Sequence, residues 1–108
     1  MNTDRIRELN DTFRTTLRGG RALMTSGVAE LPDCVKAEAI VQVASFSEFT
    51  PDNDPHGEHD FGSFTLVGRE FFWKIDYYDR KSMEYGSEDP ADPTMTTRVL
   101  TIMFAGEY

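Results

Sequence analysis

The stretch FGSFTLVGREFFWKIDYYD, residues 61–79, decides how this chain folds. It contains two runs rich in aromatic and β-branched residues, Phe61–Val67 and Glu70–Asp79, a composition typical of β-strands. Gly68-Arg69 separates the runs and can form a two-residue hairpin turn. In the second run alternate side chains are expected to face the core, namely Phe71, Trp73, Ile75 and Tyr77. The stretch therefore predicts a β-hairpin with one buried face.

Helical patterns precede this hairpin. Thr3 or Asp4 can cap a first helix, and Gly19-Gly20 is expected to end it because glycine adopts the left-handed C-cap conformation without strain. A second helix is expected to open at Pro32-Asp33, and Arg21–Val28 predicts a short strand between the two. The apolar residues at three- and four-residue spacing are Ile6, Leu9, Phe13 and Leu17 in the first helix and Val35, Ala39, Val43 and Phe46 in the second.

The end of the chain fits two structures. Asp92-Pro93 is a typical N-cap and first-turn pair, so Pro93–Phe104 is interpreted as a third helix, although its β-branched residues argue for a strand. Ser82–Tyr85 can add a further short strand. The inward residues of this third helix would be Met95, Val99, Ile102 and Met103. The predicted fold is α+β, a single domain over residues 1–108 with a small antiparallel sheet of three to four strands and about three helices packed on one face.

The composition is that of an acidic protein. The 108 residues carry a net charge of −8, yet residues 1–21 are net basic, and the acids gather in Glu48–Asp60 and Glu84–Asp92. This charge disfavours direct nucleic-acid binding and favours a protein partner with a basic surface. The single Cys34, the charged N-terminus and the lack of an apolar run of about 20 residues predict a cytoplasmic protein with no membrane contact.

One loop carries a dense group of candidate functional residues, and Pro51, Pro55 and Gly57 mark it as turn-rich. Its potential metal ligands are Asp52, Asp54, His56, Glu58, His59 and Asp60. His56 and His59 with a carboxylate could bind a transition metal, whereas an EF-hand is excluded because Ser63 stands where its last ligand is required. The alternative is structural, since Asp and Asn cap turns and histidine bonds backbone carbonyls. We expect no cofactor.

The same loop suggests acid–base chemistry. The catalytic candidates are Glu58, His59 and Asp60, with Asp76, Tyr77 and Tyr78 on a neighbouring strand. No nucleophile motif, phosphate loop or dinucleotide fingerprint accompanies them. The candidate binding residues are Asp52, Asp54, His56, Glu58, Asp76 and Tyr78.

Four blocks of sequence point to a family. They are TPDNDPHGEHDFGSF (50–64), FWKIDYYD (72–79), YGSEDPADP (85–93) and RVLTIM (98–103). With these blocks the chain resembles the small bacterial proteins of domain-of-unknown-function family 3768. That resemblance implies no known activity and no catalytic residues, and it implies a stand-alone protein of the bacterial accessory genome.

Two functions compete at this stage. The first is a binding module that presents an acidic loop and an aromatic and acidic strand face to a basic protein, in its sharper form an inhibitor of a host or defence nucleoprotein. The second is a small metal-dependent or acid–base hydrolase centred on the loop Asp52–Asp60. An enzyme would gather its titratable groups in a concave pocket, while a binding module would spread its carboxylates over a convex face.

Overall fold

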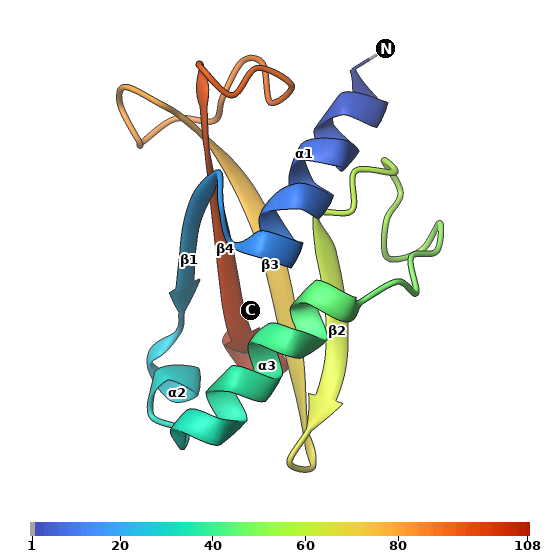
Figure 1. The fold of residues 1–108 in the computed structure, drawn as a ribbon, viewed down its shortest axis with the longest axis vertical. Coiled ribbons are helices and arrows are strands. Elements are labelled where there is room, and N and C mark those ends of the chain that lie inside the picture. The colour runs from blue at the N-terminus through green and yellow to red at the C-terminus, as the bar shows by residue number, and fades with distance from the viewer. Residues whose placement is uncertain (1) are drawn as a thin grey trace.

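A computed structural model describes residues 2–108 and contains three α-helices, four strands and a final 3-10 turn (Figure 1). In chain order these elements are α1 (Thr3–Thr16), β1 (Gly20–Met24), α2 (Ser26–Ala29), α3 (Asp33–Ser45), β2 (Phe61–Leu66), β3 (Arg69–Asp79), β4 (Thr96–Phe104) and η1 (Ala105–Glu107). The predicted α+β class is confirmed. No helix within residues 2–108 is long and apolar enough to span a bilayer.

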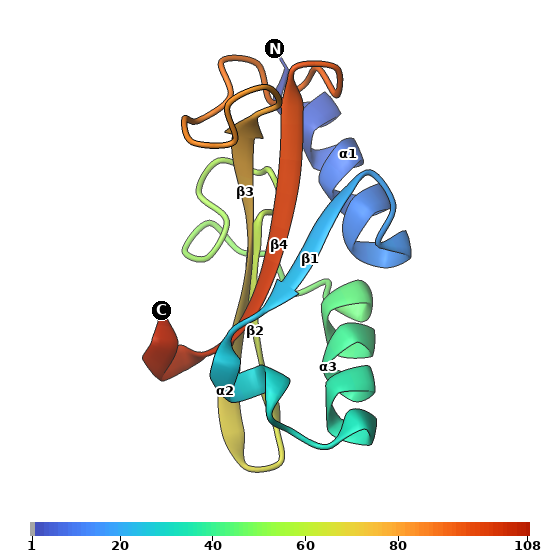
Figure 2. The same ribbon diagram turned by 90° about the vertical axis from the view of Figure 1, so that its left-hand side faces the viewer.

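The four strands form one sheet in the order β1-β4-β3-β2. The expected antiparallel sheet is mixed, because β1 runs parallel to β4 while the other two pairs are antiparallel. A parallel pair requires a long connection, and here residues 25–95 lie between the two strands. Figure 2 shows α1 and α3 on the same face of the sheet, as predicted, while the short 3-10 helix η1 lies on the opposite side, which carries no α-helix.

The central hairpin follows the predicted alternation. Phe71 and Trp73 are fully buried and Ile75 nearly so, whereas Lys74 between them is only half-buried. The turn falls one residue earlier than expected, at Val67-Gly68, and both residues have positive φ. Two-residue hairpin turns favour this backbone because its twist matches that of the strands.

The predicted third helix is wrong, because Thr96–Phe104 is the strand β4. β4 lies inside the sheet and is buried on both faces, so its sequence lacks the alternation of a half-covered strand. Its β-branched residues gave the correct indication. Asp92 caps a local turn by accepting from the backbone N–H of Thr94 at 2.9 Å, and no helix follows.

Two other expected strands differ from the structure. The strand predicted over Arg21–Val28 starts one residue earlier and ends at Met24, where α2 takes over. Gly20 opens it because a Cβ there would lie 2.4 Å from the carbonyl oxygen of Arg98, so only glycine allows this close approach. Ser82–Tyr85 forms turns, and only the isolated bridge from Tyr78 to Gly86 follows them.

Candidate functional site

Residues 46–60, here called the first acidic loop, connect α3 to β2 and pass beside the N-terminal half of α1 (Figure 1). Arg7 on α1 donates from its Nη1 to the carbonyl oxygen of Gly57 at 3.0 Å. Asp52 and His56 are exposed at the loop surface, while Asp54 is 8% exposed. The loop is therefore docked on α1, and its acidic residues differ sharply in their exposure.

The buried carboxylate of Asp54 organises the turn that follows it. Its Oδ1 accepts hydrogen bonds from the backbone N–H groups of Glu58 and His59, each at 3.1 Å. These bonds satisfy donors that would otherwise be lost, since His59 has a left-handed backbone with φ of 55°. Asp54, a predicted binding residue, is thus engaged inside the loop.

His59 lies between two carboxylates and an aromatic ring. Its Nδ1 is 3.0 Å from both carboxylate oxygens of Asp11 on α1, and its Nε2 is 3.8 Å from Oδ2 of Asp54. The imidazole stacks on Phe49 with ring centroids 3.7 Å apart and an interplanar angle of 3°. Arg14 holds the same Asp11 carboxylate at 3.0 Å. His59 therefore joins the loop to α1.

Glu58 belongs to a second hydrogen-bond network, which includes residues of α1, β3 and β4. Tyr77 donates its hydroxyl to Oε1 of Glu58 at 2.7 Å and accepts from Nδ2 of Asn10 at 2.8 Å. The same Nδ2 lies 3.0 Å from the carbonyl oxygen of Glu58, and Oδ1 of Asn10 accepts from Nε of Arg98 at 2.7 Å. Asn10 is completely buried and Arg98 nearly so. The network thus ties the loop to α1, β3 and β4.

Burial changes the proton affinities around this network. It raises the pKa of Tyr77, and the hydrogen bond to Glu58 raises it further, so the phenol stays protonated and donates. Burial also lowers the pKa of Arg98. Burial raises the pKa of Asp60 above its usual value, with the charge of Glu58 as the second cause. Asp60 is thus the loop carboxyl whose ionisation the fold opposes.

The three catalytic candidates do not meet in one cavity. Glu58 is bonded to Tyr77, His59 is bonded to Asp11, and the hollow beside His59 is an open depression that Phe49 and His56 also line. Within residues 2–108 no three His, Cys, Asp or Glu side chains converge in a way that could hold a metal ion. The arrangement suits an anchored loop better than a reaction centre.

The predicted binding residues lie on two different surfaces. Asp52, Asp54, His56 and Glu58 belong to the first acidic loop. Asp76 and Tyr78 belong to the sheet face that carries no α-helix, where they line a shallow groove of about 460 Å³. Asp76 is paired there with Lys74 at 3.0 Å. These six residues were expected on an acidic loop and on a strand face, and the two groups lie on different surfaces.

Four residues that anchor the loop were missed in the sequence. Asn10, Asp11 and Arg98 belong to the two networks above, and Arg14 pairs with Asp11 and lies over the ring of Phe49 at 5.2 Å. Asn10 and Arg14 lie on the inward face of α1 together with Ile6 and Phe13. Polar residues at core positions of an amphipathic helix are unusual, because burying them requires hydrogen-bond partners. Asn10 and Arg14 at inward positions of the first helix were therefore the signal in the sequence that indicated a buried hydrogen-bond network.

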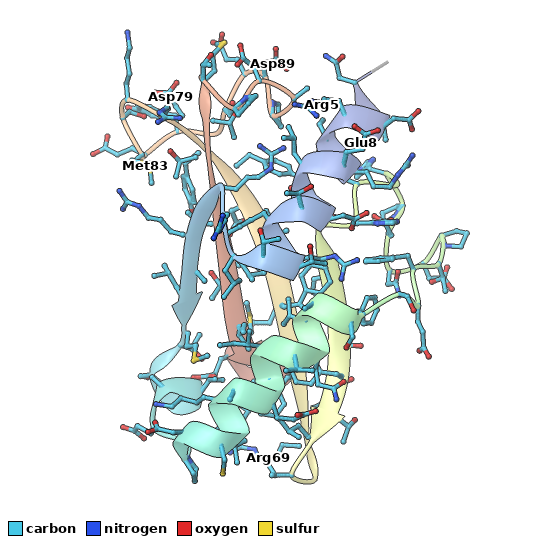
Figure 3. The ribbon with its side chains drawn as sticks, in the orientation of Figure 1. Arg5, Glu8, Arg69, Asp79, Met83 and Asp89 are labelled. Atoms are coloured by element: carbon cyan, nitrogen blue, oxygen red, sulfur yellow. The ribbon has the colours of Figure 1, made fainter. Side chains whose placement is uncertain are left out.

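Residues 80–95, here called the second acidic loop, connect β3 to β4 and are held by short-range bonds. The carboxylate of Asp79 accepts from the N–H groups of Lys81 and Ser82, and these bonds lower its pKa. Glu84 and Glu88 are exposed. Figure 3 shows Asp89 of this loop at the same end of the molecule as Arg5 and Glu8 of α1.

A family model described as a protein of unknown function, DUF3768, matches residues 24–107. The chain belongs to the DUF3768 family. No curated protein and no solved structure matches it. The DUF3768 match contains both acidic loops and strands β2, β3 and β4, whereas α1, which anchors the first loop, precedes it. The DUF3768 description assigns no activity, so function has to be argued from the geometry above.

Proposed function

We propose that this protein is a binding module that presents the exposed carboxylates of its two acidic loops to a basic surface on another protein. The observation that carries this proposal is that some acids of the loops are bonded within the fold while others are exposed to solvent. Asp54 and Glu58 are engaged inside the fold, while Glu48, Asp52 and Glu84 are exposed. The two loops lie on either side of the N-terminal half of α1 (Figure 1).

The charge of the loops supports a basic partner. The first acidic loop holds five carboxylates and no lysine or arginine, and residues 82–95 hold four more acids without a basic residue. Such a field speeds the encounter with a positively charged surface and repels phosphate backbones. Proteins that bind nucleic acid carry positively charged surfaces. The sharper proposal is an inhibitor that acts in the cytoplasm by occupying the basic channel of a nucleoprotein.

Fewer observations support a hydrolase. Glu58, His59 and Asp60 are adjacent in the loop, but the first two are bonded to Tyr77 and Asp11, and the hollow beside them is open. Acid–base catalysis requires groups that reach one substrate atom from a common pocket. The binding module is therefore the better proposal.

A charge-matched pair of variants tests this proposal. The loop variant is E48Q/D52N/E84Q/E88Q, and the control is E30Q/D33N/E38Q/E70Q, which removes the same number of exposed acids elsewhere. Each immobilised protein is incubated with nuclease-treated bacterial lysate and then eluted with heparin, a polyanion that competes for basic surfaces. We expect the wild type and the control to retain a common set of nucleic-acid-binding proteins that the loop variant loses.

A captured protein then allows a direct test of inhibition. Added wild-type protein is expected to displace labelled DNA or RNA from it, and the loop variant is expected to do so at least about tenfold less effectively. If the loop variant retains and displaces as well as the wild type does, the acidic loops are not the binding surface.

A further inference from the structure

Strand β1 forms one edge of the sheet and is unusually open. Four of its five residues are exposed, whereas β2 at the other edge has a single exposed residue. A free edge presents unpaired backbone groups that can accept another strand, and proteins commonly cover or charge such edges. In this fold α1 and α3 leave β1 uncovered, as Figure 2 shows.

The backbone groups at this edge can be assigned by alternation. The N–H of Thr25, directly after β1, donates to the carbonyl oxygen of Ile102 on β4 at 3.1 Å. Because successive residues of a strand direct their backbone groups to opposite sides, those of Ala22 and Met24 point to the free edge. An added strand would find donors and acceptors there.

An apolar hollow of about 170 Å³ adjoins the edge. It lies between β1, the end of α1 and α3, and its lining includes Leu17, Ala22, Met24, Ile40 and Leu100. A cavity of about 150 Å³ accepts a benzene-sized group, so this hollow is large enough for one leucine or phenylalanine side chain. Leu23 and Val41 extend the apolar surface, since each is more than half exposed.

Unpaired positive charge marks the N-terminal end of β1. Within residues 2–108, Arg18, Arg21 and Arg80 take part in no ion pair, whereas Arg5 and Arg7 on α1 pair with acids of the same helix. Arg21 and Arg80 border one hollow beside Gly19-Gly20. The basic excess of residues 1–21 is therefore located at this edge, in a protein whose net charge is −8.

We infer that the β1 edge is a docking site for an extended acidic peptide of a partner protein. The peptide adds a fifth strand beside β1, bonds to Ala22 and Met24, and places one apolar side chain in the hollow. A carboxylate of the peptide faces Arg18 and Arg21. This is peptide recognition by strand addition, in which the backbone supplies affinity and the pocket and charge supply specificity.

A second copy of this chain fits the site less well. β1 itself, GRALM, has no carboxylate, so pairing of two β1 strands would leave both sets of arginines without a partner. Two molecules of net charge −8 also repel each other. Charge complementarity therefore favours an acidic peptide.

The probe is a phage-displayed library of random peptides about ten residues long, which is enough to cover a strand and its flanks. Ala22→Pro removes the outward N–H while leaving the ladder to β4 intact, because proline is tolerated where an edge strand faces solvent. R18E/R21E tests the charge. Its control is R5E/R69E, which makes the same change at residues near the two ends of the molecule (Figure 3).

We expect selected peptides to combine alternating apolar residues with at least one acid. Their affinity should fall at least about tenfold for A22P and for R18E/R21E but not for R5E/R69E. Backbone amide signals of Ala22 and Met24 should shift when such a peptide binds, which keeps the test decisive if A22P fails to fold. The loop variant E48Q/D52N/E84Q/E88Q should bind the peptides unchanged, which separates this site from the proposed acidic surface.

Three results would overturn the inference. One is selection of no peptide, and another is selection of peptides that bind R18E/R21E as tightly as the wild type. The third is a concentration-dependent dimer in light scattering that A22P dissociates, because a second copy would then occupy the edge.

Discussion

The first acidic loop is bonded to residues far away in the sequence, whereas the second is bonded mainly within residues 79–98. The first reaches Arg7, Asn10 and Asp11 on α1 and Tyr77 on β3. The second is built from carboxylate and hydroxyl caps two or three residues apart, with longer links such as the bond between Ser87 Oγ and Thr96 Oγ1 at 2.6 Å.

This difference shows that similar composition can serve different purposes. Both loops are rich in acids and contain two prolines and one glycine each, a composition that favours turns. In the first loop Asp54, Glu58 and His59 are bonded within the fold, so anchoring accounts for these three residues. In the second loop Glu84 and Glu88 are exposed and available. The following predictions test that contrast.

The largest expected effect is at the anchor of the first loop. Asn10→Ala removes bonds to Glu58, Tyr77 and Arg98 and leaves Nε of the buried Arg98 guanidinium without an acceptor. We expect the free energy of unfolding to fall by about 3 kcal/mol, measured by urea denaturation. Thr15→Ala, an exposed control on the same helix, should change it by less than about 0.5 kcal/mol. A small effect of Asn10→Ala would mean that the network does not anchor the loop.

A smaller effect distinguishes the turn-capping carboxylates of the two loops. Asp54→Ala leaves the N–H groups of Glu58 and His59 without a partner in a buried setting, so we expect a loss of about 2 kcal/mol. Asp92→Ala should cost less, because its bonds to Thr94 lie at the surface. Hydrogen exchange at Glu58 and His59 should accelerate only in the first variant. Equal losses would remove the distinction between the loops.

The pH dependence of two carboxyl groups should have opposite signs. The folded-state pKa of Asp60 is raised by burial, so its contribution favours folding below the unfolded pKa of about 4 and turns into a cost as pH rises through the folded pKa. Asp60→Asn should therefore raise the Tm at pH 7, and this gain should disappear in acid.

Asp79 should behave in the reverse way. Backbone hydrogen bonds lower its pKa in the folded state, so its stabilisation is present above the unfolded pKa and is lost as pH falls through the folded one. Asp79→Asn should lower the Tm at pH 7 and have little effect in strong acid. The Tm of both variants is measured from about pH 2 to 8, a range that brackets carboxyl titration. If Asp60→Asn and Asp79→Asn shifted the Tm at pH 7 in the same direction, the predicted opposite signs would be wrong.

The smallest expected effect on stability is in the second loop. The double variant E84Q/E88Q should change the free energy of unfolding by no more than about 0.5 kcal/mol, because both side chains are exposed. The same variant should weaken capture of a basic partner. A large loss of stability would show that these acids are structural, like Asp54 and Glu58 of the first loop.

The sequence predicted local features better than distant ones. The alternation in residues 71–77 identified β3 and its buried face because a half-covered strand has period two. β4 was mistaken for a helix because a strand buried on both faces lacks that alternation, and Asp92-Pro93 resembles a helix start. The parallel pairing of β1 with β4 depends on contacts between opposite ends of the chain, which no local pattern records.

The candidate loop was also identified from the sequence, but its role was not. Asp52–Asp60 is dense in titratable groups, and local reasoning cannot tell an anchor from a site. The distinction depends on Asn10 and Asp11, nearly fifty positions away, and on Arg98 at the other end of the chain.

The position of β4 has a consequence for how the protein is made. Of the four strands in residues 2–108, β4 is synthesised last, yet it lies between β1 and β3. Until it emerges, β1 has no hydrogen-bonding partner in the sheet and β3 can pair only with β2. Closing contacts between the two ends of a chain is slow and leaves strand edges open meanwhile. Chains that end before residue 96 should therefore leave β1 and one edge of β3 unpaired and should aggregate.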